Sequence, residues 1–318
     1  MRRWTWMIGF VLFFIPCFAQ AQYPDILDLQ IQYLPNSTLT EPQSAKVQLT
    51  TYEVGLNIPI PLYKLTTFLI PGVAYRVDST SFEGAPKSFQ ELRGLHSLDF
   101  SLLFVQIFKK KWSMSIRVAP GLAGDFASID AGLFRMSGVG MVTYSFSDRF
   151  VLGGGVLANY SFGQFLPLPA VYVDWKPIPQ FQLEGFIPAF LNIKYIPVKR
   201  VELGVRVEFG GNSYGVRGPA IHQSWPCSTD VPEQGASQGE RTAKPSACFD
   251  NLTYSTGSVG LTFAVRLFSS LWLNSYAGYT FFRRFEPFNA KGEPLSEADL
   301  LPNQFLIRAG ITWKIPGQ

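Results

Sequence analysis

The sequence offers few side chains suited to catalysis, because its only histidines are His96 and His222. A serine hydrolase needs a histidine that takes the proton of the serine and is itself oriented by a third group. Ser97 follows His96 directly, but neighbouring residues of a strand point to opposite faces and cannot pair. His222 has no metal-ligand partners nearby in sequence, and carboxylates such as Asp125 and Asp130 are common in solvated loops. We therefore expect no catalytic residue, no cofactor, no metal site and no enzyme activity.

Charged residues at alternate positions offer a second kind of chemistry, the attraction of ions and polar solutes. Glu202, Arg206 and Glu208 alternate with aliphatic residues, and Glu184 precedes them in a nearby segment. Inside a water-filled barrel, three acids beside one base would attract cations. A dry interior would instead require a base such as Lys194 to pair with every acid. The other bases expected on the inner face are Arg117, Arg135, Arg266 and Arg308, the last of them opposite Asp28 where the barrel closes.

These charges lie in segments whose apolar and polar residues alternate with a period of two. Residues 201–209 place Val205 on an aliphatic face and Arg206 on a polar one. The same alternation recurs at residues 112–119, 258–267 and 305–314. Such segments run for about 9 to 15 residues, and a tilted strand needs about 9–11 residues to cross a bilayer.

The links between the segments alternate between short and long, as in an up-and-down barrel. Short links are expected near residues 59–62, 109–111, 147–149, 176–180, 197–199 and 269–270. Longer links are expected near residues 35–45, 78–94, 124–131, 163–164, 188–191, 211–253 and 286–302. We therefore predict an all-β fold, a single-chain antiparallel transmembrane β-barrel of about 14 strands with short periplasmic turns and long external loops. The segments 181–187 and 192–196 are the weakest, which leaves 12 strands as the alternative.

The composition favours one large all-β unit in a membrane. Of the 318 residues, 47% are hydrophobic and only 16% charged, whereas soluble domains have about 25% charged residues. A face of Val, Leu, Ile and Phe suits lipid, because hydrocarbon offers no hydrogen-bond partner. The alternative is a secreted β-sandwich or propeller, whose polar face would have to cover the outside. The net charge of +4 forms no basic stripe for nucleic acid. Aromatic residues expected beside the short turns are Trp112, Tyr144, Phe146, Phe150, Trp175 and Trp313.

The N-terminal segment has the pattern of a secretory signal peptide. A positive start precedes an apolar run at residues 6–18, and residues 19–21 form an A-x-A cleavage site. We expect residues 1–21 to be removed, and residues 22–318 to form the barrel in the outer membrane of a Gram-negative cell. The alternative is a lipoprotein that is acylated at Cys17, although the residue before this cysteine is Pro16 rather than a small residue.

The mature chain would then contain two cysteines, Cys227 and Cys248, in one stretch rich in Gly, Ser and Pro. In an oxidising compartment such a pair favours a disulfide, with two free thiols as the alternative. The disulfide would lie within the long external loop at residues 211–253.

Four stretches combine strand residues with proline, glycine or aromatic signatures: residues 54–61 (VGLNIPIP), 69–75 (LIPGVAY), 118–122 (VAPGL) and 277–283 (AGYTFFR). In these stretches the chain resembles an uncharacterised outer-membrane β-barrel family common in Bacteroidota. The resemblance covers nearly the whole mature chain and implies no catalytic residues. Many such barrels end in an aromatic residue that assists assembly, whereas this chain continues past Trp313 to Gln318.

The expected function is that of a passive channel or solute-uptake barrel, porin-like in character. Its lumen charges would be Arg117, Arg135, Glu184, Glu202, Arg206, Glu208 and Arg266. The main alternative is a structural or partner-binding barrel that acts through the external loop 211–253, and a membrane-embedded enzyme ranks third. The expected partners are outer-membrane lipid, small polar solutes and another outer-membrane or surface protein.

Overall fold

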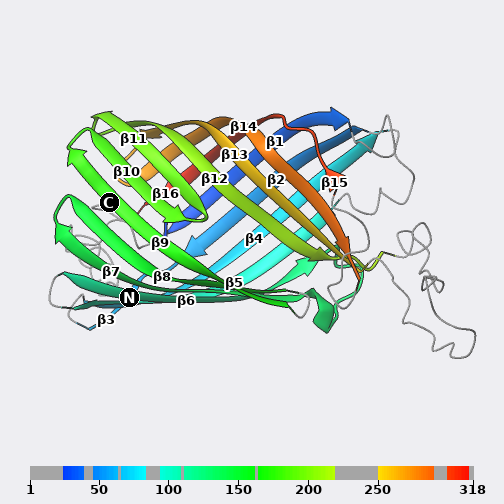
Figure 1. Ribbon diagram of the computed structural model, residues 1–318, viewed down its shortest axis with the longest axis horizontal. Helices are drawn as coiled ribbons and strands as arrows, with labels where there is room; N and C mark the ends of the chain where they lie inside the picture. The colour runs from blue at the N-terminus through cyan, green and yellow to red at the C-terminus, as the bar shows by residue number, and fades with distance from the viewer. Residues whose placement is uncertain are drawn as a thin grey trace, which may run out of the picture.

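The computed structural model describes residues 24–38, 46–63, 66–83, 94–108, 111–161, 164–218, 250–289 and 299–314. Most of these residues belong to one antiparallel sheet that closes into a 14-stranded barrel (Figure 1). The wall strands are β1 (Leu27–Thr38), β2 (Lys46–Asn57), β4 (Thr67–Glu83), β5 (Gly94–Phe108), β6 (Trp112–Gly124), β7 (Phe134–Ser147), β8 (Phe150–Ser161), β9 (Gln164–Ile178), β10 (Phe181–Ile187), β11 (Phe190–Val198), β12 (Val201–Gly215), β13 (Asn251–Arg266), β14 (Leu271–Phe288) and β16 (Phe305–Trp313). Three further elements are short: β3 (Ile60–Tyr63), the 3-10 helix η2 (Ala131–Leu133) and β15 (Asp299–Leu300).

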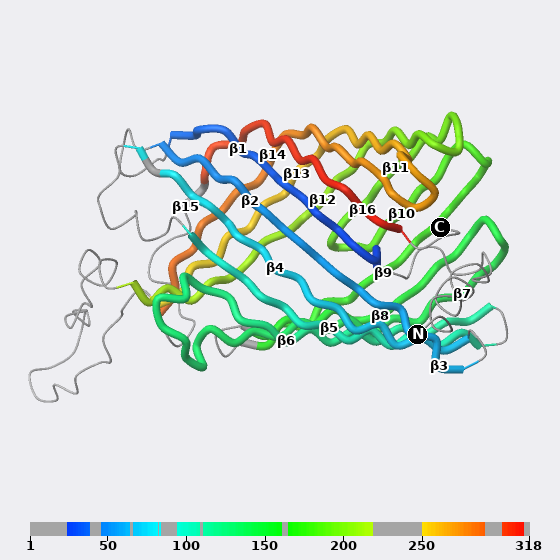
Figure 2. The backbone as a smooth tube through the Cα atoms, turned by 180° about the vertical axis from the view of Figure 1, so that it is seen from behind, coloured from blue at the N-terminus to red at the C-terminus, as the bar shows by residue number. Residues whose placement is uncertain are grey.

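The first and last wall strands close the barrel. β1 pairs with β2 on one edge and with β16 on the other, so Leu27 lies opposite both Leu56 and Trp313. Figure 2 shows β1 in blue beside β16 in red. The prediction of 14 antiparallel strands is confirmed, and it includes the two weakest segments, because β10 and β11 form a regular hairpin.

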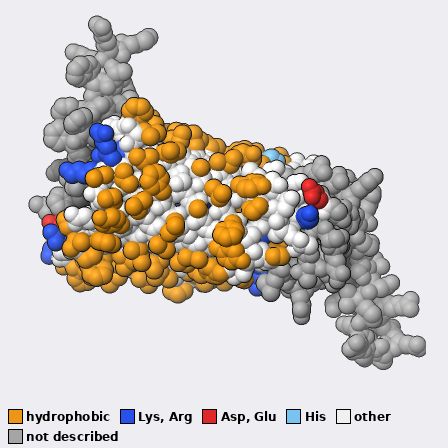
Figure 3. All heavy atoms as spheres, turned by 90° about the horizontal axis from the view of Figure 1, so that it is seen from above, with side chains coloured by type: hydrophobic (Ala, Val, Ile, Leu, Met, Phe, Trp, Pro, Cys, Tyr) orange, Lys and Arg blue, Asp and Glu red, His pale blue; other side chains and the backbone are white. Residues whose placement is uncertain are grey.

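Apolar side chains cover the outer surface of the wall. On β12, Leu203, Val205 and Phe209 are all at least 40% exposed, and the charged residues between them point inward. Figure 3 shows hydrophobic side chains along the wall and Lys and Arg side chains gathered at its left-hand end, which is the short-turn end. Because hydrocarbon accepts no hydrogen bond, this surface matches the apolar interior of a membrane.

In the described part of the chain, no helix has the length and apolarity that a membrane span requires.

The links depart from the predicted alternation of short and long at three places. At the long-loop end, β8 and β9 are separated only by residues 162–163, and β10 and β11 only by residues 188–189. The predicted turn at residues 59–62 is wrong, because β3 continues to pair with β4 up to Tyr63. Strand structure also extends into the predicted loop 211–253, since β12 ends at Gly215 and β13 begins at Asn251.

At the long-loop end, β12 leaves the circular strand order and reaches β6. Gly215 forms a parallel bridge with Gly124, and the N–H of Asp125 donates to the Gly215 carbonyl at 3.1 Å. A Cβ atom at Gly124 would lie 2.5 Å from that carbonyl oxygen, so the close approach needs a glycine. Arg217 secures the contact, because its Nε donates to Asp130 Oδ2 at 2.7 Å. Strands β7–β11 are therefore bypassed at this end.

Packed apolar side chains fill the interior in the long-loop half. One cluster contains Leu34, Val47, Leu49, Tyr254, Tyr276, Leu301 and Leu306, and a second contains Leu95, Ala123, Tyr214, Val216 and Leu252. Phe285 packs against both clusters and joins them. A wide water-filled pore along the axis would need this space.

Aromatic side chains predicted beside the short turns are in mutual contact. The ring centroids of Trp112 and Tyr144 are 4.7 Å apart, and those of Tyr144 and Phe146 are 4.8 Å apart. Phe150 extends the row, with its centroid 5.3 Å from that of Phe146. These residues form part of an aromatic border to the apolar surface.

Several sequence predictions lie outside the described residues. They are the signal peptide at residues 1–21, His222, the pair Cys227 and Cys248, and most of the loop 211–253. These stay predictions.

Candidate functional site

A cavity of about 250 Å³ lies inside the barrel, toward the end where the short turns are. Its walls come from β1, β11, β12, β13, β14 and β16, from Asp25, which precedes β1, and from Lys314, which follows β16. The charged lining residues are Asp25, Lys194, Glu202, Arg206, Arg308 and Lys314. The lining is polar because these strand positions alternate with the lipid-facing ones.

Two of the predicted lumen acids each have a lysine partner. Lys194 Nζ lies 2.6 Å from Glu184 Oε2, and Lys314 Nζ lies 3.6 Å from Glu202 Oε1. The prediction that three acids face one base is therefore wrong. Both lysines share the inward parity, but only the closed barrel brings Lys314 from the end of the chain to Glu202.

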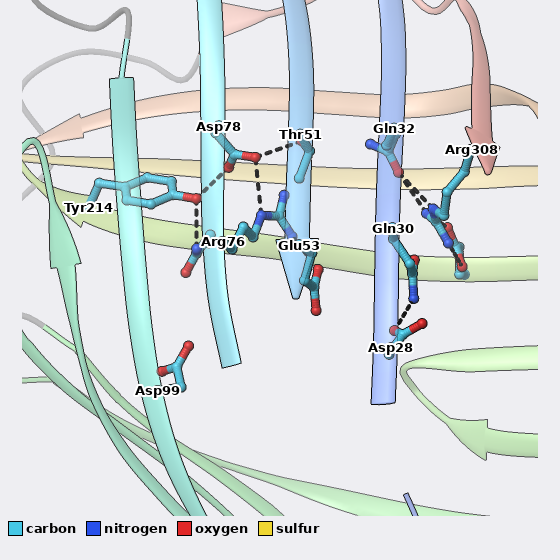
Figure 4. A network of polar contacts seen from close by, with 12 residues as sticks. Asp28, Gln30, Gln32, Thr51, Glu53, Arg76, Asp78, Asp99, Tyr214 and Arg308 are labelled. Carbon is cyan, nitrogen blue, oxygen red and sulfur yellow. Dashed lines mark hydrogen bonds and ion pairs between the residues drawn. The ribbon is translucent and has the colours of Figure 1, made fainter. Parts of the chain in front are cut away.

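Two guanidinium groups share the carboxylate of Glu208. Arg206 Nε donates to Glu208 Oε2 at 2.8 Å, and Arg308 donates to the same carboxylate from β16, across the interior. Arg308 Nη2 also donates to Gln32 Oε1 at 2.7 Å (Figure 4). The prediction that Arg308 lies opposite Asp28 is wrong, because the register of β1 and β16 places it opposite Gln32. Two positive charges thus share one negative charge.

The β10–β11 hairpin contacts a lining residue through its tip and lines the cavity through β11. The guanidinium carbon of Arg206 lies 4.4 Å from the centroid of the Phe190 ring. Asn192 lines the cavity two residues farther along β11, where it is only 5% exposed. Within the described ranges, its Oδ1 atom has no hydrogen-bond partner. A buried carbonyl oxygen without a donor is costly, so Asn192 presents an acceptor to a bound solute.

Of the seven predicted lumen residues, Glu202 and Arg206 line this cavity, Glu184 and Glu208 are paired with lining residues, and the other three do neither. Arg135 Nε donates to Asp99 Oδ1 at 3.1 Å. The guanidinium carbon of Arg266 lies 5.8 Å from the centroid of the Trp272 ring. Arg117 is exposed on the inward parity of β6. The tertiary structure therefore separates them from Glu184, Glu202, Arg206 and Glu208.

A second polar network lies farther toward the long-loop end (Figure 4). Asp78 accepts hydrogen bonds from Thr51 Oγ1 at 2.6 Å, from Arg76 Nε at 3.1 Å and from the Tyr214 hydroxyl. Asn212 Nδ2 donates to the Tyr214 oxygen at 2.7 Å. Among the described residues, no buried side-chain nitrogen or oxygen of this network lacks a hydrogen-bond partner, so we assign it a structural role.

Asn192, Tyr276 and Lys314 are among the lining residues that sequence reasoning missed. Lys314 could have been predicted from the sequence, because it continues the inward-facing alternation of Arg308 past the last strand. Asn192 begins a short segment in which the parity is hard to assign. Tyr276 is an aromatic residue in an apolar stretch, and its hydroxyl lies 2.9 Å from Ser258 Oγ.

His96 lies on the outward face of β5, opposite to Ser97. Its Nδ1 is hydrogen bonded to the Tyr75 hydroxyl at 2.8 Å, and its ring stacks on Phe126 with centroids 5.8 Å apart. Ser97 is 1% exposed on the opposite face. Among the residues that the structure describes, no group of three or more His, Cys, Asp or Glu side chains could hold a metal ion.

Two carboxyl groups outside the strands have shifted pKa values. Burial raises the pKa of Asp25, and the nearby Lys314 only partly offsets this effect. The hydrogen bond from Arg217 lowers the pKa of Asp130. Asp25 therefore keeps its proton to a higher pH than an exposed aspartate does.

No curated protein matches this chain in sequence. Among solved structures, the chain is similar to an outer membrane channel from Pseudomonas putida F1, with 8% identity and a TM-score of 0.46 over 93% of this chain and 97% of that one. It is also similar to the TodX deltaS2 mutant, a monoaromatic hydrocarbon channel, with 11% identity and a TM-score of 0.39 over 96% and 94% of the two chains. For the outer membrane phospholipase A from Escherichia coli, the identity is 8% and the TM-score 0.37 over 92% and 98%. A family described as a domain of unknown function (DUF6268) matches residues 16–292. This match spans most of the sequence, and the chain therefore belongs to the DUF6268 family.

Proposed function

We propose that this protein is a solute-uptake barrel of the outer membrane whose interior cavity binds a small anionic solute. The observation that carries this proposal is the sharing of Glu208 by Arg206 and Arg308. A guanidinium group binds a carboxylate or phosphate through two parallel hydrogen bonds. Arg308 donates to Glu208 and to Gln32, whereas Arg206 donates only through its Nε within the described residues, so its other donors remain for an anion.

The rest of the cavity supports an anion rather than the cation expected from the sequence. Lys194 and Lys314 line it together with Arg206 and Arg308, whereas the acids of the lining are only Asp25 and Glu202. The free Oδ1 of Asn192 would accept a hydrogen bond from a hydroxyl or amino group of the solute. Drug-sized ligands occupy pockets of about 300–1,000 Å³, so a cavity of about 250 Å³ suits a smaller molecule.

The proposal includes the route of the protein to its membrane. Residues 1–21 direct export and are cleaved, and the short turns of the barrel then face the periplasm of a Gram-negative cell. The lumen residues of the proposal are Glu184, Glu202, Arg206 and Glu208 together with Lys194, Arg308 and Lys314. A distribution in Bacteroidota stays a prediction from the resemblance.

Titration calorimetry of the purified full chain with succinate tests the binding step. We expect Arg308→Gln to weaken binding at least tenfold and Glu208→Gln, which frees both guanidinium groups, to strengthen it. Arg284→Gln is the matched control, because Arg284 is paired with Glu286 and lies outside the cavity. Absence of succinate binding, or equal binding by wild type and both cavity variants, would overturn the proposal.

Uptake is measured separately with proteoliposomes. We expect radiolabelled succinate to enter faster than choline, because the cavity favours anions. Binding without entry of succinate would contradict uptake and would support the alternative of a partner-binding barrel.

A further inference from the structure

The barrel wall is incomplete between β9 and β12 in the long-loop half. The hairpin that separates these strands is short, with 7 residues in β10 and 9 in β11, against 15 in each neighbour. Its pairing ends at Ile187 opposite Val171 on β9 and at Phe190 opposite Glu208 on β12. With 7 residues, β10 is shorter than the about 9–11 residues that a strand needs to cross a bilayer, so we place the turn at residues 188–189 within the apolar zone.

Beyond this turn, β9 and β12 do not pair with each other in the described sheet. β9 continues to Gln164 with β8 as its partner, and β12 continues to Gly215 with β13 as its partner. The last hydrogen bond to the hairpin runs from the N–H of Phe209 to the Ala189 carbonyl at 2.8 Å. At about 3.3 Å per residue, the five residues between Phe209 and the bridge at Gly215 leave roughly 17 Å of the β12 edge without a strand partner in the described sheet, facing a gap.

The edge of β9 is built to remain unpaired. The N–H of Lys176 points toward β8, because it donates to the Arg149 carbonyl at 2.7 Å. Backbone groups alternate along a strand, so the nitrogens of Pro167 and Pro169 face the gap. Proline has no N–H to donate, and in sheets it is confined to edges, strand starts and bulges. The two prolines therefore fit a β9 edge that stays without a pairing strand in the middle of the wall.

Among the residues that the structure describes, no side chain fills this gap. Leu166 has the inward parity of Ala170 but is 56% exposed, and Phe165 and Phe209 on the two edges are 63% and 51% exposed. A Cβ atom added at Gly210 would meet no other atom within 4 Å. The interior of the barrel is thus accessible through the wall between these residues.

The surface inside the gap is apolar and leads to the polar cavity. Met141, Ala170 and Tyr172 form a buried cluster on the inner wall, with Val151, Leu157 and Phe186 packed against it. Phe186 lies opposite Phe190 at the hairpin tip. The guanidinium group of Arg206 lies over the Phe190 ring in a cation–π contact. An apolar surface from the bilayer and a cationic site in the lumen therefore meet at Phe190.

We propose that the gap between β9 and β12 is a lateral entrance for an amphipathic anion with an aliphatic chain. Its anionic group binds Arg206 and Arg308, and its chain lies along Phe186 and Phe190 and extends through the gap into the outer leaflet. The bridge of β12 to β6 and the apolar clusters obstruct the path along the barrel axis from the long-loop end. The lateral path through the wall avoids both obstacles. This inference rests on the proposed function and specifies its substrate class.

The test uses the full chain in phosphatidylcholine vesicles and a dodecanoate that carries a diazirine at the end of its chain. After illumination, mass spectrometry of the peptides locates the label. We expect label on the peptides that contain residues 165–171, 186–190 and 206–212, and we expect excess succinate to reduce it. Gly210→Trp should reduce this labelling at least tenfold by filling the gap.

Gly140→Trp is the matched control, because Gly140 also has no atom within 4 Å of its Cβ position but lies on β7. It should leave the labelling unchanged. Should Gly210→Trp fail to fold, Leu166→Trp fills the gap from its other edge. Label spread evenly over the outer surface, or unaffected by the filled gap, would overturn the inference. Succinate binding separates the two failures: if it persists, only the lateral entrance is wrong, and if it is absent, the proposed function is wrong as well.

Discussion

The hydroxyl of Tyr214 donates a hydrogen bond to the carboxylate of Asp78 across the barrel interior, although the two residues are 136 positions apart in the chain. The two residues are 1% and 2% exposed. The bond joins the end of β12 to β4, which lies on the far side of β5 and β6 in the strand order. Together with the bridge from Gly215 to Gly124, it holds β12 over the interior and packs the long-loop half.

Removal of this hydroxyl should destabilise the barrel. In Tyr214→Phe, Asp78 loses one donor and Asn212 loses its acceptor, and an unsatisfied buried group costs about 1–3 kcal/mol. The measurement is the urea midpoint of unfolding, followed by the heat-modifiable migration of the barrel on gels. Tyr279→Phe is the control, because the Tyr279 hydroxyl makes only an exposed contact of 3.4 Å to the Asn303 carbonyl. Equal destabilisation by both variants would contradict the structural role of the Asp78 network.

The two faces of β12 should respond differently to charge. Val205 faces lipid near the middle of the strand. Val205→Arg should therefore lower the free energy of unfolding by on the order of 2–4 kcal/mol. Arg206→Ser should cost less, because Glu208 keeps Arg308 as its partner. Refolding yield into vesicles measures both variants. A Val205→Arg protein that folds like wild type, beside an Arg206→Ser protein that does not, would show that the assignment of faces is inverted.

We predict a disulfide between Cys227 and Cys248. In the chain-entropy model, closing a loop of about 20 residues in this way stabilises it by roughly 3 kcal/mol. The stabilisation arises because the cross-link lowers the conformational entropy of the unfolded loop. Maleimide labelling of denatured protein should modify neither cysteine without reductant and both after reduction. Labelling of both cysteines without reductant would show that the thiols are free.

The contact between Arg217 and Asp130 should depend on pH. Because the pKa of Asp130 is lowered in the folded protein, its carboxylate contributes stability at pH values above the unfolded pKa of about 3.9. This contribution is lost as the pH falls through the lower, folded pKa. NMR titration should show the lowered pKa in wild type and a return toward about 3.9 in Arg217→Ala. A pKa for Asp130 that is the same in both proteins would exclude Arg217 as the cause.

The period of two in the sequence was sufficient to determine the fold class, the strand number and the direction in which most side chains point. Alternation is a local property, since each residue of a strand points opposite to the one before it. Val205 and Arg206 on β12, and His96 and Ser97 on β5, could therefore be assigned to opposite faces without knowledge of any other strand. The composition of the faces then favoured a barrel in lipid over a soluble sandwich.

Only the tertiary structure determined which inward charges meet. The contact from Arg308 to Glu208 spans 100 positions, and it depends on the register of β1 with β16 and on the curvature of the closed wall. No local pattern contains this information, so the sequence wrongly placed Arg308 opposite Asp28. The lateral gap likewise exists because the β10–β11 hairpin ends before its neighbours β9 and β12 do. Where the hairpin ends along these strands is determined by the register of the strand pairing. Pro167 and Pro169 were visible in the sequence, but they identify an edge only once β9 has a place in the sheet.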